Sequence, residues 1–191
     1  MRYFSILILI TLCNTSYCQN CFDIEYDIRW KQSDYAGRSR FIFNDSFSYY
    51  YFKSEIDSLQ FETVFSESVI HHSAFCDKKL NLEYVGVNYP AGNIYLIKQN
   101  IKKLNWQLYA ETKVILGHIC FKAVTKIYSR KITVWYTKDL GVGNGLPYYA
   151  GLPGTILKID DKSRNQRFDA VKITKGNYQF FLPEARIMDK N

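Results

Sequence analysis

Side chains that could do nucleophilic or metal chemistry are few in this 191-residue sequence, and their spacing defines no active site. The histidines are His71, His72 and His118. Because His71 and His72 are adjacent, an extended chain points them to opposite faces, and neither an HExxH motif nor a paired CxxC accompanies them. A metal held by His71, His72 and Cys76 is one interpretation. A solvated loop is the simpler one, and we predict no metal site.

Three carboxylates recur at a spacing of two near the start of the chain: Asp23, Glu25 and Asp27. In a strand such residues share one face, where paired acids could serve general acid and base catalysis. Acids alternating with apolar residues also mark the solvent-facing side of a half-buried strand, and we predict that role. The sequence lacks a GxSxG nucleophile motif. We therefore predict no catalytic residue and no cofactor, and expect that the protein is not an enzyme.

The one glycine-dense region spans residues 141–154. Gly151 and Gly154 flank Leu152-Pro153, which predicts a tight turn with two positions free to adopt positive φ. A phosphate-binding loop would lead into a helix that carries Lys and Ser or Thr, whereas residues 155–159 continue as a strand. Nucleotide binding is therefore not predicted.

The N-terminus has the order of a secretory signal peptide: a cation, an apolar stretch over residues 3–12, and a polar exit. The apolar stretch is about ten residues, half of what a bilayer span needs. We predict a signal peptide over residues 1–18 and a single domain over residues 19–191. The rival interpretation is a lipoprotein signal acylated at Cys13 or Cys18. No later stretch reaches transmembrane length, so we expect a periplasmic or extracellular protein.

Removal of that segment leaves Cys21, Cys76 and Cys120. An odd number in an oxidising compartment predicts either one disulfide with a spare thiol or three reduced, buried thiols. The pattern places Cys120 in an apolar strand and Cys76 in a loop, and a Cys76–Cys120 disulfide is one possible pairing. A redox role for Cys120 lacks the CxxC motif that would support it.

The composition is rich in aromatic residues and moderately basic. Its 16 Tyr, 13 Phe and 3 Trp make 17% of the chain, which favours a pleated sheet over a helical bundle and excludes disorder. The formal net charge is +7, but the cations stand in scattered pairs such as Lys78-Lys79, Lys102-Lys103 and Arg130-Lys131. This balance is compatible with anionic partners, although solvated turns explain it equally simply, and we expect no nucleic-acid partner.

Alternating apolar residues predict an all-β fold with nine to eleven short, mainly antiparallel strands, and at most one or two short helices. The clearest strand is residues 22–30, and residues 40–43 and 47–52 form a predicted hairpin. The stretch 53–79 has no settled period. Spacing of Ile97, Ile101 and Leu104 suggests one short helix or turn. Further strands are expected at 80–84, 93–98, 106–111, 120–128, 131–136, 155–159, 167–173 and 178–181, the later ones as a meander.

Four segments in order resemble the GLPGLI family of bacterial envelope proteins. They are Trp106, residues 115–123 (ILGHICFKA), residues 134–137 (VWYT) and residues 151–159 (GLPGTILKI). His118 and Thr155 depart from the family pattern, as does the Gly-Leu-Pro at residues 145–147. The resemblance implies an exported β-rich protein of bacteria with an outer membrane, without an assigned reaction. The chain is also similar to the bowl-like N-terminal domain of some peptide N-glycanases, which implies a curved antiparallel sheet or open barrel.

These features favour a non-enzymatic binding or interaction protein of the bacterial cell envelope, with an envelope protein, lipid or glycan as its partner. A periplasmic lipid or lipoprotein carrier with an apolar cavity is the alternative, and a thiol-dependent or carboxylate-dependent enzyme is the second alternative. The aromatic face of the sheet decides between them, because it is either packed core or an open binding surface.

Overall fold

The computed structural model describes residues 15–30, 35–54, 73–88, 94–141, 146–181 and 186–190, and these form one open sheet of twelve strands. The strand order is β12-β6-β5-β4-β3-β2-β1-β11-β10-β9-β8-β7. Neighbours pair antiparallel except β12, which runs parallel to β6. The sheet does not close, so β12 and β7 are its two edges. The predicted all-β class is confirmed.

The strands follow each other along the chain with short connections in most places. They are β1 (Thr15–Trp30), β2 (Tyr35–Phe43), β3 (Phe47–Ser54), β4 (Ser73–Asp77), β5 (Leu82–Asn88), β6 (Ile94–Asn100), β7 (Gln107–Ile115), β8 (His118–Ile127), β9 (Arg130–Thr137), β10 (Thr155–Asp161), β11 (Gln166–Phe181) and β12 (Arg186–Asp189).

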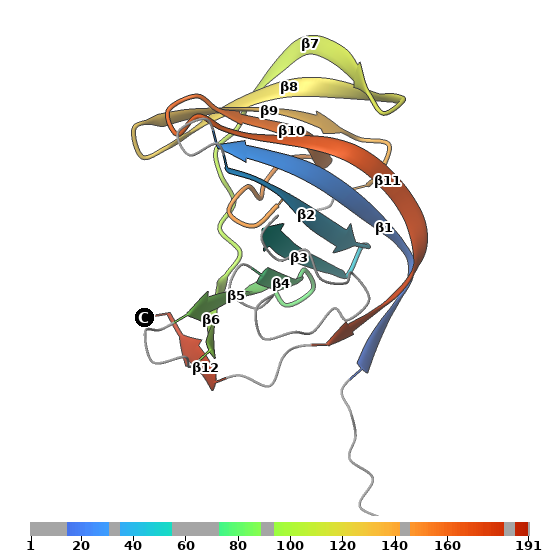
Figure 1. Ribbon diagram of the computed structural model, residues 1–191, viewed down its shortest axis with the longest axis vertical. Helices are drawn as coiled ribbons and strands as arrows, with labels where there is room; N and C mark the ends of the chain where they lie inside the picture. Colours follow the sequence, from blue (N-terminus) through green and yellow to red (C-terminus); the bar gives the residue numbers. More distant parts are fainter. Residues whose placement is uncertain are drawn as a thin grey trace, which may run out of the picture.

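The two longest strands, β1 and β11, form the spine of the sheet. They pair antiparallel from Thr15↔Phe181 to Trp30↔Gln166, with irregular register between Cys18 and Cys21 and between Glu25 and Tyr26. Extra residues of this kind bend a strand and increase its twist. Figure 1 shows the sheet curving along this pair, so that β7 to β10 lie across from β3 to β6.

The predicted hairpin and the predicted C-terminal meander are both confirmed. Phe43 pairs with Ser48 across the turn between β2 and β3, and β7 to β11 are neighbours in sequence order. Residues 167–173 and 178–181, predicted as two strands, are parts of the single strand β11, because the bend occurs without a break in pairing. Strand β4 lies in the stretch 53–79, interpreted from the sequence as a loop with possible short strands, and β12 was not predicted, so the count of nine to eleven is too low.

The sequence predicts a short helix or a turn over residues 97–104, and the structure has no helix there. Ile97 belongs to β6, and residues 101–106 form an irregular connection to β7. The apparent helical spacing arises because this connection buries Ile101, whose backbone N–H donates to the Asn81 carbonyl at 3.0 Å. A residue anchored to another strand can match a helical period without any helix.

The apolar face of β1 is packed core. Ile24, Tyr26 and Ile28 are buried together with Phe41 and Phe43 of β2, and the same cluster includes residues of β8 to β11. The Tyr26 hydroxyl donates to the Ile156 carbonyl at 2.6 Å, and burial raises the pKa of Tyr26 well above its ordinary value. Over these strands the aromatic residues fill the inside of the curve themselves.

The glycine-dense connection between β9 and β10 crosses the inside of the curved sheet (Figure 1) and contributes Leu140, Leu146 and Leu152 to the core. Gly151 has φ +110°, as predicted for a turn glycine. Gly154 does not have positive φ. A Cβ there would lie 2.9 Å from the Thr137 carbonyl carbon, so Gly154 is needed for close backbone approach to β9.

Strand β1 begins at Thr15, inside the segment predicted as a signal peptide, and extends well before residue 22, where the sequence places its start. The signal peptide and the cleavage before Gln19 stay predictions. In the part of the chain that the structure describes, no helix is both long and apolar enough to cross a membrane.

Candidate functional site

A cleft of about 1290 Å³ lies on the open side of the curved sheet. Its walls come from six parts of the chain: the 101–105 connection, the start of β7, the β8–β9 hairpin, the turn at residues 146–150, Arg164 of the β10–β11 loop, and residues of β4 to β6 with Lys190. Small-molecule pockets usually occupy about 300–1,000 Å³, so this cleft has room for an oligomeric ligand.

Cations dominate the lining of the cleft. Its seven cationic side chains are Lys102, Lys103, Lys126, Arg130, Lys131, Arg164 and Lys190. Arg130 pairs with Asp161, and Lys190 donates to Gln99 at 2.9 Å. The other five make no ion pair within the described residues. Because Glu83 is the one carboxylate of the lining, the cleft carries a strong excess of positive charge.

Two tyrosines on the lining, Tyr128 and Tyr148, hold unusual backbone conformations and are exposed. Tyr128 has φ +55° and is 94% exposed, and Tyr148 has φ +70° and is 59% exposed. Positive φ is disfavoured for a bulky side chain. Both residues occupy turn positions where glycine is the usual choice, so both rings are presented at a cost in backbone energy.

The local hydrogen bonds account for these turns. Tyr128 is the first residue of the two-residue loop between the paired Ile127 and Arg130. Tyr148 follows Pro147 in a turn that the Tyr149 N–H closes on the Leu146 carbonyl at 2.9 Å. That is the i+2 position of a proline turn, which with positive φ corresponds to type II.

A buried acid lies at the floor of the cleft and holds the Tyr148 turn. Glu83 is 5% exposed, accepts from Gln99 Nε2 at 2.8 Å, and accepts the backbone N–H of Tyr148. Burial raises the pKa of Glu83, and the hydrogen bond from Gln99 opposes that rise. Its carboxylate is therefore committed to fixing the turn that presents Tyr148.

Hydrogen bonds join the walls of the cleft to one another. Ala150 O accepts from the Leu104 N–H at 2.9 Å and from Trp106 Nε1 at 3.1 Å. The Thr125 hydroxyl donates to Asn105 O at 2.7 Å. These contacts fix the 101–105 connection against both the turn and the β8–β9 hairpin, so the cleft is built before any ligand arrives.

Asp161 positions the two arginines of the lining. It is buried, and its Oδ2 accepts from Arg130 Nη1 at 2.7 Å. Its Oδ1 accepts from Ser163 Oγ at 2.6 Å and from the Arg164 backbone N–H at 3.3 Å. One carboxylate thus holds the start of β9 and the β10–β11 loop together at the cleft.

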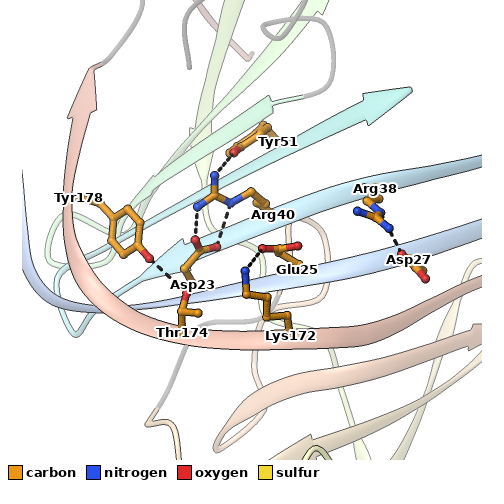
Figure 2. A network of polar contacts seen from close by, with 9 residues as sticks. All are labelled: Asp23, Glu25, Asp27, Arg38, Arg40, Tyr51, Lys172, Thr174 and Tyr178. Carbon is orange, nitrogen blue, oxygen red and sulfur yellow. Dashed lines mark hydrogen bonds and ion pairs between the residues drawn. The ribbon is translucent and has the colours of Figure 1, made fainter. Parts of the chain in front are cut away.

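The carboxylates of β1 lie elsewhere, on the opposite face of that strand from its apolar side chains, and each has its own cation (Figure 2). Asp23 accepts from Arg40 Nε at 3.2 Å and pairs with Arg40 Nη2 as well, while Glu25 pairs with Lys172 at 3.2 Å. Asp27 lies 3.5 Å from Arg38. The prediction of a fully exposed polar face is wrong for Asp23, which is 2% exposed.

Figure 2 also shows why this group is structural. Arg40 Nη1 donates to the Tyr51 hydroxyl at 2.9 Å, so the guanidinium bridges β1 and β3. Burial lowers the pKa of Arg40, but the hydrogen bonds that Arg40 donates to Asp23 and Tyr51, together with the charges of these two groups, raise the pKa overall. With each acid matched to a cation, the three carboxylates do not form the paired acid and base of a hydrolase.

The predicted Cys76–Cys120 pairing is wrong, because both thiols are free and buried, Cys76 in β4 and Cys120 in β8 on different parts of the sheet. Cys21 is disulfide-bonded. Burial raises the pKa of Cys120 to about 11 and that of Cys76 to about 12. Both thiols stay protonated near neutral pH, which disfavours a nucleophilic or redox role.

Of the three histidines, His118 alone lies within the described residues. His118 Nδ1 lies 3.2 Å from Asp139, whereas His71 and His72 lie outside the described residues. Among the described residues no group of three His, Cys, Asp or Glu side chains is placed to hold a metal ion.

Sequence reasoning missed the cleft, although part of its signal was visible. The pairs Lys102-Lys103 and Arg130-Lys131 were noted as scattered cations, and the fold brings both pairs to one cavity. A bulky residue after Leu146-Pro147, and another in a two-residue hairpin loop, were further local signals of strained turns.

The fold and the site thus define a class of protein: an open, curved, mainly antiparallel sheet with a basic cleft on its open side. Within it, residues 90–181 match the family described as the N-terminal domain of N-glycanase peptide. The matched segment is just under half of the chain and contains most of the cleft lining. No curated protein matches the sequence.

Solved structures resemble the fold over nearly the whole chain. PNGF-II in the C2 space group has a TM-score of 0.64, and PNGF-II in the P21 space group has 0.60, each at 21% sequence identity. The similarity covers 90% of this chain but 31% of PNGF-II, so the chain spans about a third of the length of these proteins. The predicted distant resemblance to the N-glycanase N-terminal domain is therefore supported, while the GLPGLI resemblance stays a prediction.

Proposed function

We propose that this chain is an exported, non-catalytic binding protein of the bacterial cell envelope, and that the basic cleft is its binding site for an anionic ligand. The observation that carries the proposal is the gathering of five unpaired cations in one preformed cleft with a single buried carboxylate. Elsewhere on the described surface several cations face acids, as Arg38, Arg40 and Lys172 do.

The chemistry of the candidate catalytic groups supports binding over reaction. The thiols of Cys76 and Cys120 have raised pKa values and are buried, and Glu83 is engaged by Gln99 and the Tyr148 backbone. The likeness to the N-terminal domain of an N-glycanase, rather than to a whole enzyme, is in keeping with this proposal.

The lining of the cleft favours an anionic polymer over an acyl chain, and so favours a binding protein over a lipid carrier. Its larger apolar members, including Ile101, Val124 and Leu146, are themselves buried in the core. An acyl chain would leave the five unpaired cations of the lining without a counter-charge, whereas an anionic polymer supplies one.

Titration calorimetry with a soluble polyanion tests the proposal. Oligogalacturonate and polyglutamate of matched charge are the probes, and Lys102→Glu with Lys126→Glu is the test variant. We expect the double variant to lose at least about tenfold in affinity for any polyanion that binds, because charge reversal at the cleft opposes the ligand.

The control is Lys79→Glu with Lys175→Glu, two exposed lysines outside the cleft lining whose reversal makes the same total charge change. It should bind within about twofold of the original protein, since solvent screens a distant charge. Equal losses in the control and in the cleft variant would mean that only net charge matters. Absence of binding by the original protein to either polyanion would refute the proposal.

A further inference from the structure

We infer that the anionic ligand of the cleft is an acidic saccharide chain, held by lysines at its acidic groups and by Tyr128 and Tyr148 at the faces of its sugar rings. This inference rests on the proposed function and names the ligand class of the same site.

The first step is that the backbone conformation directs the rings of Tyr128 and Tyr148 towards solvent, so that neither ring is part of the core. Tyr149, which follows Tyr148 in the chain, is partly buried and packs against the core. Tyr128, by contrast, is 94% exposed at positive φ. Strained conformations persist where surrounding contacts fix them, and they cluster at binding sites.

The second step is how Tyr148 is held. The turn is closed by the Tyr149 N–H, Pro147 fixes its own φ, and buried Glu83 accepts the Tyr148 N–H. The backbone that carries the ring is therefore rigid, while 59% of the residue stays exposed. A rigid aromatic face loses little conformational entropy on binding.

The third step is the match between these groups and the ligand. The C–H face of a pyranose ring packs on the electron-rich face of an aromatic ring, and its acidic substituent forms charge-assisted hydrogen bonds with an ammonium group. Tyr128 lies between Lys126 and Lys131 along the chain, so ring and cations occur on one hairpin.

An acidic peptide or an anionic bilayer fits the cleft less well. Peptides anchor through apolar side chains in apolar pockets, and the apolar lining here is buried, as at Leu146 and Ile101. A flat bilayer meets the exposed rim of a concave cleft of about 1290 Å³ but leaves its interior unfilled.

The experiment measures binding by titration calorimetry to oligogalacturonate, to polyglutamate of matched charge, and to phosphatidylglycerol vesicles. The variants are Tyr128→Ala with Tyr148→Ala, Tyr128→Phe with Tyr148→Phe, and Val114→Ala as an exposed truncation outside the cleft. We expect the alanine pair to lose about tenfold or more for oligogalacturonate, and the phenylalanine pair and the control to stay within about twofold.

The inference is supported if oligogalacturonate binds more tightly than polyglutamate and only the former depends on the rings. It is overturned if both polymers bind equally and respond equally to the alanine pair, or if only vesicles bind. If the two polymers bind equally but the cleft variant Lys102→Glu with Lys126→Glu binds both more weakly, the cleft is an anion site and the proposed function holds. The inference of a saccharide ligand then fails. Circular dichroism of each variant confirms that the fold is retained.

Discussion

At the scale of single residues, the structure separates side chains that stabilise the fold from side chains that the fold presents. Tyr26 is buried with its hydroxyl bonded to Ile156 O, and it belongs to the core. Tyr128 has the same chemistry but a positive φ and almost full exposure. The difference lies in the backbone position, because a two-residue hairpin loop points its side chain away from the sheet.

Substitutions at Tyr128 test this strain directly. At ordinary φ an alanine is more stabilising than a glycine, whereas at positive φ the order reverses by about 1 kcal/mol. We therefore expect Tyr128→Gly to have a higher free energy of unfolding than Tyr128→Ala, measured by urea denaturation. The opposite order would show that the loop does not hold positive φ in solution.

At the scale of elements, the turn at 151–154 uses its two glycines for different reasons. Gly151 takes positive φ, whereas Gly154 lets β10 start against the β9 backbone at Thr137. A methyl group can be accommodated by a neighbouring flexible side chain, but a neighbouring carbonyl cannot move without disturbing the strand pairing.

Gly154→Ala should accordingly lower the free energy of unfolding by about 3 kcal/mol, because its Cβ meets backbone. Gly117→Ala is the matched comparison. That glycine has φ +82° with nothing within 4 Å of an added Cβ, so the expected loss is about 1 kcal/mol from conformation alone. Thermal or urea unfolding of the two variants checks the order, and a larger loss at Gly117 would contradict it.

The β4–β5 turn carries a pH-dependent contribution through Lys78. Its Nζ lies 5.4 Å from the centre of the Phe43 ring and donates to Asn44 O, and burial lowers the pKa of Lys78 to about 8, against an opposing effect of Asp45. Between about pH 8 and its ordinary value of 10.5 the unfolded chain binds more protons than the folded one. The free energy of unfolding due to Lys78 therefore rises with pH across that window.

Lys78→Met isolates this effect, because it keeps a chain of similar length without the charge. The difference in unfolding free energy, original protein minus variant, should increase between pH 7.5 and 10.5 in urea titrations. Titration of Cys76 in the same range opposes the trend, and because Cys76 and Lys78 interact electrostatically, the same comparison is made in a Cys76→Ala background. A difference that is constant with pH would rule out the lowered pKa.

At the scale of the whole molecule, the fold divides its charges between two regions. Ion pairs such as Lys122–Glu111, Lys158–Asp169 and Lys172–Glu25 connect neighbouring strands. The cleft instead keeps five cations that make no ion pair within the described residues. The cleft thus holds a local excess of positive charge, which is a distribution suited to attracting anions.

Salt should therefore affect binding and folding differently. Raising sodium chloride from 50 to 500 mM should weaken oligogalacturonate binding by about tenfold or more, because the attraction acts between solvated charges. The unfolding midpoint should change little, since surface ion pairs contribute little and the core is apolar. Calorimetric titration and thermal unfolding at the two salt concentrations check this, and salt-independent binding would contradict it.

The sequence by itself determined the class of fold, because alternation and turn residues are local properties. The alternating residues 22–30 and the break at residues 44–46 predicted strands within β1, β2 and β3, and the pairing of β2 with β3. It could not show that β11 continues through its bend, or that Asp23 is buried, since both depend on which strand lies alongside.

Only the tertiary structure decided where the candidate site lies. Lys102, Tyr128, Tyr148 and Arg164 come from separate connections, and nothing in their local sequence links them. They meet because the β1–β11 spine bends the sheet, and because Ala150 O holds the 101–106 connection against the β9–β10 loop. Such contacts between distant segments are set by packing, so a pattern of cations that is scattered along the chain becomes one basic cleft in the folded protein.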